Sequence, residues 1–207
     1  MKKLMQEMGL RSIRSATIKE RKKEKRARIK KENLLKNVFT ANAPNQIWVS
    51  DITQYCFLDY RVFICVILDL FSRKVIAYKV SKKQTTQLVA STFQMAYGSR
   101  LPKEFIFHSD RGCQYTANSF QKKLELANAV QSFSRPGTPG DNSVMESFFS
   151  TLKKEELYRV HYRSFKDFEK SLEQYMDFYN EVRPHNTLKY KTPQQAELDY
   201  WLSNPSS

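Results

Sequence analysis

Three acidic residues lie in sequence contexts that are unusual for a solvent-exposed acid and that suit a role in catalysis or metal binding. Asp51 lies within an apolar, β-branched segment, where an unpaired carboxylate is costly to bury. Asp110 ends another apolar segment and precedes Gly112, which permits a close backbone approach. Glu146 flanks the apolar stripe of a predicted helix. If the fold brings these carboxylates together, they suit Mg²⁺ or Mn²⁺, and two such ions about 4 Å apart would stabilise the attacking and leaving oxygens of a phosphoryl transfer.

Each of these acids also has a plainer interpretation. Asp51 could pair with a nearby Lys or Arg, and Asp110 fits an ordinary Asx turn. Glu146 fits a capping box with Ser143 at the start of its helix. Asp69 competes for the metal role, although its setting is more typical of a turn that ends a strand. The residues alone leave these alternatives open.

The hydrophobic pattern predicts the elements that must position the three acids. Runs of β-branched and aromatic residues predict strands at 47–57, 62–68, 74–80, 105–107 and 130–133. Apolar residues at helical spacing predict helices at 85–97, 116–129, 143–158 and 165–182. Short connections favour an antiparallel meander for the first three strands. The order β-β-β-α-β-α-β-α-α therefore predicts an α/β fold, in which a mixed five-stranded sheet carries helices on both faces.

Charge is concentrated at one end of the chain. The 207 residues carry a net charge of +14, and residues 1–40 alone hold 14 Lys or Arg and four Glu. The densest run, 21–31, has no aromatic residue and almost no apolar periodicity. A polyanion such as DNA or RNA fits this arm, because each neutralised phosphate releases counterions. A solvated tail that aids solubility is the alternative.

Composition excludes several classes of protein. The longest apolar stretch, 62–70, is interrupted by Asp69 and is far shorter than the roughly 20 residues that span a bilayer. The basic N-terminal segment lacks the apolar run of a secretory signal. Three widely separated Cys and three His without ligand spacing argue against a disulfide scaffold and a structural zinc site. We therefore expect no membrane association and a cytoplasmic location.

Several ordered motifs together carry a family resemblance. They read WVSDIT at 48–53, LDLFSRK at 68–74, HSDRGCQY at 108–115, DNSVMESFFSTLKKE at 141–155 and YNEVRPH at 179–185. Thirty-five residues separate Asp110 from Glu146. This pattern resembles the integrase catalytic core of bacterial insertion-sequence transposases of the OrfB type. These enzymes belong to the DDE superfamily, which includes the retroviral integrases. The resemblance covers roughly residues 44–197.

The resemblance implies a fold and a reaction. It implies a ribonuclease-H-like sheet in which Asp51, Asp110 and Glu146 are the catalytic, metal-binding triad. Two Mg²⁺ or Mn²⁺ ions would then activate water, or a DNA 3′-hydroxyl, for in-line attack on a phosphodiester, with no covalent protein–DNA intermediate. The implied function is a DNA transposase that cleaves and transfers strands at the ends of an insertion sequence. A nuclease of the same fold is another enzyme that would suit these residues.

Five further residues are candidates for DNA contact. Lys153 lies seven residues after Glu146, two helical turns on and on the same face, where family members carry Lys or Arg; a solvated basic residue is the alternative. The other four follow the second Asp or border the Gly- and Pro-containing loop 135–142: Gln114, Tyr115, Arg135 and Asn142. Tyr115 could instead serve packing, and Asn142 could cap its helix.

The resemblance also implies an organisation and partners. Residues 1–43 would form a basic helical arm, the remnant of a helix-turn-helix region, and 44–203 the integrase-like core with its C-terminal helices. Only LMQEMGL at 4–10 resembles the last helix of that region, so we expect the chain to be truncated at its N-terminus. Expected partners are element-end and target DNA, further copies of the chain in a homo-oligomer on DNA, and an OrfA-type protein. The alternative function is a truncated, non-catalytic DNA-binding remnant that modulates a full-length transposase.

Overall fold

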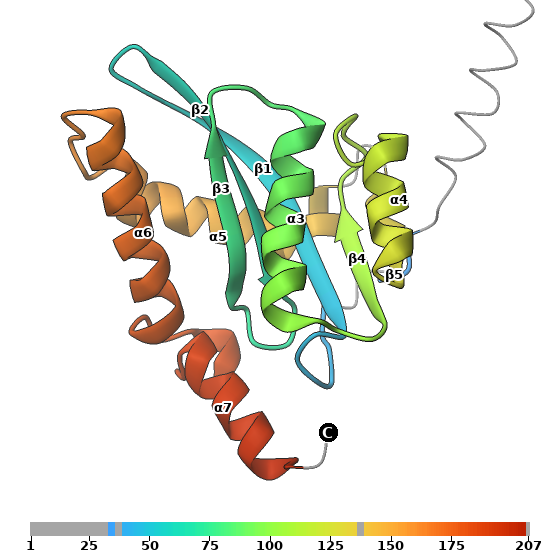
Figure 1. The fold of residues 1–207 in the computed structure, drawn as a ribbon. Coiled ribbons are helices and arrows are strands. Elements are labelled where there is room, and N and C mark those ends of the chain that lie inside the picture. The colour runs from blue at the N-terminus through green and yellow to red at the C-terminus, as the bar shows by residue number, and fades with distance from the viewer. Residues whose placement is uncertain (1–32, 36–38, 136–138, 206–207) are drawn as a thin grey trace, which may run out of the picture. The chain divides into compact units, whose positions relative to one another are not determined.

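A mixed five-stranded sheet forms the centre of the molecule (Figure 1). The computed structural model describes residues 33–35, 39–135 and 139–205. The basic arm expected at 1–43 falls almost wholly outside these residues, so it stays a prediction. The strand order is β3-β2-β1-β4-β5. Within the described residues, none of the helices is both long enough and apolar enough to cross a membrane.

The strands confirm the predicted meander and the predicted mixed sheet. β1 (Ile47–Phe57), β2 (Tyr60–Asp69) and β3 (Val75–Ser81) pair in antiparallel fashion. β4 (Phe105–Ser109) pairs parallel to β1, and β5 (Ala129–Phe133) pairs parallel to β4. β1 is therefore the strand at which the antiparallel half of the sheet meets the parallel half.

Helices cover both faces of this sheet, as the sequence predicts. α3 (Thr86–Arg100) and α4 (Asn118–Leu126) pack on one face, over a core that includes Trp48 and Phe107. α5 (Ser143–Leu152) and α6 (Phe165–Glu181) cover the other face, over a core that includes Val49. Figure 1 shows α3 in front of the sheet and α5 crossing behind it. Successive residues of β1 thus alternate between two separate cores.

The structure departs from the predicted helices at two places. The helix expected at 143–158 ends at Leu152 and continues as a π-helical turn, Lys153–Leu157. A further helix, α7 (Pro193–Ser203), follows a short 3₁₀ turn at Asn186–Leu188. The sequence carries a start signal for α7, because Thr192 and Gln195 form a capping box ahead of Pro193. Ahead of α5 lies another 3₁₀ turn, Pro139–Asn142.

Asp69 forms the strand-ending turn that its sequence context favours. Its buried carboxylate accepts hydrogen bonds from the backbone N–H groups of Asn45 (2.6 Å), Phe71 (2.9 Å) and Ser72 (3.0 Å). Because this carboxylate is occupied by local backbone donors, Asp69 serves the turn and is not a member of the candidate metal site.

Candidate functional site

Strand register makes Asp51 and Asp110 neighbours. β1 and β4 run parallel, and their last register pair is Ser50 opposite Ser109. The next residue along each chain segment is an Asp: Asp51 on β1, and Asp110 at the start of the loop after β4. Trp48 and Phe107, also register partners, both face the core under α3 and α4. By alternation, Asp51 leaves the sheet on the opposite face, which α5 covers, while Asp110 begins the loop at the adjoining end of β4. Adjacent parallel strands lie about 4.8 Å apart, so two carboxylates distant in sequence share one end of the sheet.

Helix α5 brings Glu146 to the same face. Its apolar stripe, Met145, Phe148, Phe149 and Leu152, packs into the core that also contains Val49 of β1. Glu146 flanks this stripe and is exposed. Asn142 occupies the N-cap, and within the described residues no side-chain hydrogen bond caps this helix. The capping box of Ser143 with Glu146 is thus not formed, and Glu146 is left available for another role.

The electrostatics of Asp51 reflect its surroundings. Its pKa is raised to about 7, chiefly by burial and to a lesser extent by the charges of Asp110 and Glu146. The backbone N–H of Ile52, which donates to Asp51 Oδ1 at 2.7 Å, and the charge of Lys153 act in the opposite direction. Within the described residues Asp51 forms no ion pair with a Lys or Arg, and Lys153 acts on it only through its charge. A divalent cation bound here would offset both the cost of burying the Asp51 carboxylate and its repulsion by the other two acids.

A tight loop fixes Asp110. Its Oδ1 accepts a hydrogen bond from the backbone N–H of Gly112 at 2.9 Å, which is the Asx turn that the sequence allows. A Cβ atom on Gly112 would lie 3.0 Å from Asp110 Oδ1 and 3.1 Å from Gln114 Oε1. Gln114 is itself buried, and its Nε2 donates to the carbonyl of Gln84 at 3.3 Å. A side chain at position 112 would therefore press on the Asp110 carboxylate and on Gln114.

Tyr115 lies beneath the sheet instead of at the site surface. Its side chain is 1% exposed, and its hydroxyl is 2.9 Å from Oγ of Ser50. Oγ of Ser50 also donates to the carbonyl of Val66 at 2.9 Å. This placement matches the packing alternative for Tyr115, since it supports β1 one residue before Asp51.

The segment that leads into α5 is tied down by side chains that the sequence did not single out as a group. Asp141 is fully buried and accepts hydrogen bonds from Arg135, through Nε and Nη2 at 3.0 Å each and through the backbone N–H at 2.7 Å. Arg135 thereby holds the pKa of Asp141 well below its usual range. Nε2 of buried His108 lies 2.9 Å from the carbonyl oxygen of Asp141, and Nδ1 lies 2.9 Å from Ser132 Oγ. These contacts join the start of α5 to β4 and β5.

Asn142 and Lys153 lie at the two ends of α5. Asn142 is 6% exposed, and neither Oδ1 nor Nδ2 of its amide has a hydrogen-bond partner among the described residues. A buried amide in this state calls for an explanation, such as a ligand that is bound only in a complex. Lys153 is half-buried, and its charge acts on Asp51.

The donor set suits a hard divalent cation, but it is not a closed cage. Among residues 33–35, 39–135 and 139–205, no three His, Cys, Asp or Glu side chains are already gathered tightly enough to hold a metal ion. Asp51 and Asp110 each turn one oxygen toward a local backbone N–H. Three carboxylates from β1, the β4 loop and α5 nevertheless supply the oxygen ligands that Mg²⁺ and Mn²⁺ prefer.

Comparisons with known proteins show the family of this chain. A family model described as "Integrase core domain" matches residues 41–139, and a second with the same description matches residues 128–193. The transposase for insertion sequence element IS904 of Lactococcus lactis is 34% identical over 197 residues, which cover 94% of this chain and 78% of that protein. The chain belongs to the DDE-type transposases of bacterial insertion sequences. This transposase is also 31% identical to the putative transposase InsK of element IS150 from Escherichia coli, over 90% of its own length and 67% of the relative.

Solved structures show the same fold. The transposase superposes on a chain of the simian T-cell lymphotropic virus intasome with a TM-score of 0.66 and 22% identity, over 76% of its length and 56% of that chain. The HTLV-2 integrase catalytic core domain in complex with magnesium gives a TM-score of 0.60 and 21% identity, over 76% and 99% of the two chains. The ribonuclease-H-like fold expected from the sequence is therefore confirmed.

Proposed function

We propose that this transposase cleaves DNA at the ends of an insertion sequence and transfers the resulting strands to a target, with Asp51, Asp110 and Glu146 as its catalytic residues. The observation that supports this most strongly is the strand register, which makes Asp51 and Asp110 neighbours on the face that α5 covers with Glu146. These three side chains would hold Mg²⁺ or Mn²⁺. Two such ions, when bound, supply Lewis-acid activation of the attacking and leaving oxygens.

In this proposal the protein fold positions the three carboxylates and supplies the negative charge of the site. Asp51 lies on the central strand β1, opposite Val66 of β2 and one residue beyond the last pair with β4, so the sheet fixes the position of its backbone. The Gly112 turn orients Asp110, and the contacts of Asp141 and His108 anchor the start of the helix that carries Glu146. This scaffold would hold three carboxylates together although their charges repel one another. A bound cation would offset that repulsion.

DNA contacts would surround the triad. Lys153 would neutralise a phosphate beside Asp51, and the unpartnered amide of Asn142 would bind a polar group of the strand end. Gln114, Arg135 and Tyr115 would act mainly by shaping this surface, since their described contacts are within the protein. The basic residues of the arm would add sequence-independent attraction to DNA. We further propose that the chain acts as a homo-oligomer on DNA in the cytoplasm, with an OrfA-type partner.

A non-catalytic DNA-binding remnant is the second candidate function, and one experiment separates the two. The purified chain is incubated with labelled DNA that carries the ends of its element, in Mg²⁺, beside Glu146→Gln and the surface control Glu104→Gln. We expect cleavage or joining by the wild type and by Glu104→Gln, and at least a 100-fold loss in Glu146→Gln. Equal activity in Glu146→Gln would refute the role of Glu146. DNA binding without cleavage by any variant would favour the remnant.

A further inference from the structure

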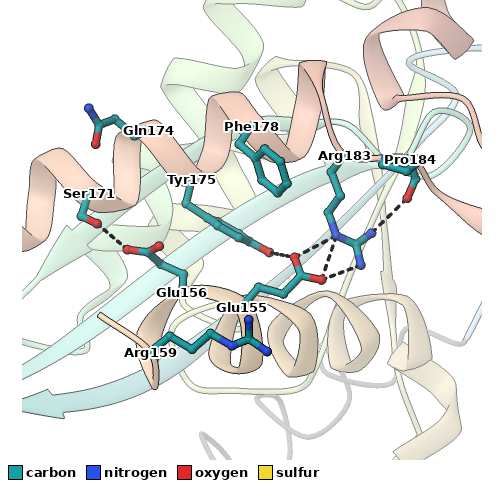
Figure 2. A pocket seen from close by; sticks show the side chains of 9 residues that line it. All are labelled: Glu155, Glu156, Arg159, Ser171, Gln174, Tyr175, Phe178, Arg183 and Pro184. Carbon is teal, nitrogen blue, oxygen red and sulfur yellow. Dashed lines mark hydrogen bonds and ion pairs between the residues drawn. The ribbon is translucent and has the colours of Figure 1, made fainter. Parts of the chain in front are cut away.

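The π-helical turn after α5 sends neighbouring side chains to opposite sides of the helix. The backbone N–H of Tyr158 donates to the carbonyl of Lys153 at 2.9 Å, a bond that spans five residues instead of four. Lys153 begins this turn on the face of Glu146, where its charge acts on Asp51. Glu155 and Glu156 point toward α6 instead, as Figure 2 shows. The position of Lys153 is therefore connected to whatever holds these two glutamates.

Glu155 is held by a forked ion pair from the end of α6. Arg183 Nε donates to Glu155 Oε2 at 2.9 Å, and Arg183 Nη2 donates to Oε1 at 2.8 Å. The hydroxyl of Tyr175 donates to Oε2 at 3.0 Å. Arg183 holds the pKa of Glu155 below its usual range, so the carboxylate stays charged at neutral pH. A planar guanidinium fork fixes direction as well as distance, which a single point charge would not do.

Further bonds fix the rest of the turn. Glu156 is buried and accepts hydrogen bonds from the hydroxyls of Tyr162 (3.0 Å) and Ser171 (2.5 Å). The hydroxyl of Tyr55, on β1, donates to the carbonyl of Leu157 at 2.5 Å. The turn is thus attached both to α6 and to the strand that carries Asp51.

The ion pair spans an open hollow between the turn and α6. This hollow has a volume of about 700 Å³ and is lined by the residues drawn in Figure 2, among them Gln174, Phe178 and Arg159. The side chains of Arg183 and Glu155 are 24% and 34% exposed, so the two partners meet at its edge. The polar contacts at this hollow add to the apolar core, in which buried Leu157 of the turn and Leu172 of α6 belong to one cluster.

Arg183 belongs to the YNEVRPH segment at 179–185, whose other members attach the same region to the core. The side-chain amide of Asn180 pairs with both backbone groups of Val75 on the edge strand β3, at 2.9 and 3.0 Å. Tyr179 packs edge-on against His185, with ring centroids 4.6 Å apart. Asn180 and Tyr179 thus fix where α6 ends, and that end presents Arg183 to Glu155.

We infer that Arg183 and Tyr175 are positioning residues for Lys153: they hold Glu155, fix the π-helical turn and so direct the Lys153 ammonium group toward DNA at the candidate site. The inference rests on the proposed function, in which Lys153 contacts a phosphate. Arg183 and Tyr175 act only through Lys153 in this scheme, and their loss costs nothing more once Lys153 is absent.

A double-mutant cycle on DNA affinity tests this coupling. The affinity of the full chain for a fluorescent duplex carrying the element end is measured in Mg²⁺ over a range of salt. Lys153→Gln should weaken binding about tenfold and reduce the salt slope by about one, because one phosphate contact is lost. Arg183→Gln and Tyr175→Phe should each reproduce part of this loss. In the Lys153→Gln background, both should have no further effect within twofold.

Controls separate positioning from a general loss of structure. The exposed ion pair of Lys191 with Asp199 on α7 offers a matched variant, Asp199→Asn, which should leave affinity and slope unchanged. Exchange of the partners, Glu155→Arg with Arg183→Glu, should recover most of the affinity. Tyr175→Phe removes only an uncharged hydroxyl group, so a changed salt slope in this variant reports a displaced cation. If Arg183→Gln does not fold, Tyr175→Phe alone still tests the inference.

The outcomes distinguish the inference from its premise. If Lys153→Gln alters neither affinity nor slope, the proposed DNA role of Lys153 is wrong and the inference falls with it. A second outcome is that Lys153→Gln has its expected effect while the affinity losses of Lys153→Gln and Arg183→Gln multiply in the double variant, or while the salt slope of the double variant falls by two. Either result would show that Arg183 acts independently of Lys153. Only the positioning inference is then overturned.

Discussion

Asp51 and Asp110 each lie one residue beyond the register pair of Ser50 with Ser109, Asp51 on β1 and Asp110 at the start of the loop after β4. Asp51 leaves the sheet on the face that α5 covers, and the charge of Asp110 acts on it. The junction between the antiparallel and parallel halves of the sheet therefore creates the acidic pair. We propose that Glu146, on the helix that packs there, completes this site.

Replacement of Asp51 by Asn should stabilise the metal-free protein. The pKa of Asp51 is about 7 in the folded protein and about 4 in the unfolded chain, so ionisation disfavours the folded state. This cost is absent below pH 4, increases between pH 4 and 7, and is constant above pH 7. A difference of about three pKa units corresponds to about 4 kcal/mol. In thermal scans over this range, the Tm of Asp51→Asn should thus exceed that of the wild type by a margin that widens with pH and reaches on the order of 10 °C at pH 8.

Magnesium should reverse that difference. A cation bound to the three carboxylates stabilises only the folded protein that has all of them, so Mg²⁺ should raise the Tm of the wild type and leave Asp51→Asn unchanged. Asp59→Asn, at the exposed turn between β1 and β2, is the control and should respond to Mg²⁺ as the wild type does. An equal response of all three proteins would place the bound magnesium elsewhere.

Gly112→Ala should impair catalysis with little loss of stability. The added Cβ would crowd Asp110 Oδ1 at 3.0 Å and Gln114 Oε1 at 3.1 Å, which displaces the carboxylate from the site. We expect at least a tenfold fall in strand cleavage, measured with element-end DNA. Gly98→Ala in α3 is the matched control, because a Cβ there meets nothing within 4 Å. If Gly112→Ala cleaved DNA as fast as Gly98→Ala, the loop would not orient Asp110.

Loss of the Arg135 side chain should destabilise the approach to α5 in a pH-dependent way. Asp141 is fully buried, and Arg135 lowers its pKa. A lowered pKa contributes stability that is present above the unfolded pKa of about 4 and is lost as the pH falls toward the folded value. The Tm of Arg135→Gln should therefore lie several degrees below the wild type at pH 7, with the gap narrowing below pH 4. The exposed Arg61→Gln should show no gap at either pH.

Asn180→Ala should loosen the attachment of α6 to the sheet. The variant loses two hydrogen bonds to Val75 on the edge strand, worth about 1–2 kcal/mol together. Chemical denaturation should show this loss of unfolding free energy, and hydrogen exchange should rise in β3. Gln94→Ala, at an exposed position of α3, should leave both measurements unchanged. Normal protection of β3 in Asn180→Ala would show that the amide does not secure this edge.

The sequence specified the sheet better than the helices at its margins. Period-two and apolar runs predict β1, β2 and β3 because these strands bury side chains in two cores. The π-helical turn was not predicted, because the helical pattern continues without a break and the turn depends on partners such as Arg183. α7 was not predicted, because its buried residues are Pro193 and Glu197 and no stripe of apolar residues marks its inner face.

The sequence indicated the three acids of the candidate site, but it did not indicate the residues that hold the surrounding segments in place. Asp51, Asp110 and Glu146 were recognisable from their local settings and their motifs. His108 contacts the main-chain carbonyl of Asp141, which any residue type could offer, so no pairing signal exists in the sequence. The neighbouring places of Asp51 and Asp110 depend on which strand lies beside β1, and this order is decided by tertiary packing.

A crystal of the protein soaked in Mn²⁺ provides the most direct test of the site, because the ion can be located by its anomalous scattering. We predict a peak bonded to carboxylate oxygens of Asp51, Asp110 and Glu146 together, and no such peak in Glu146→Gln. Manganese bound only at other residues, or carboxylates that stay apart in its presence, would contradict the proposal that these three acids form one metal centre.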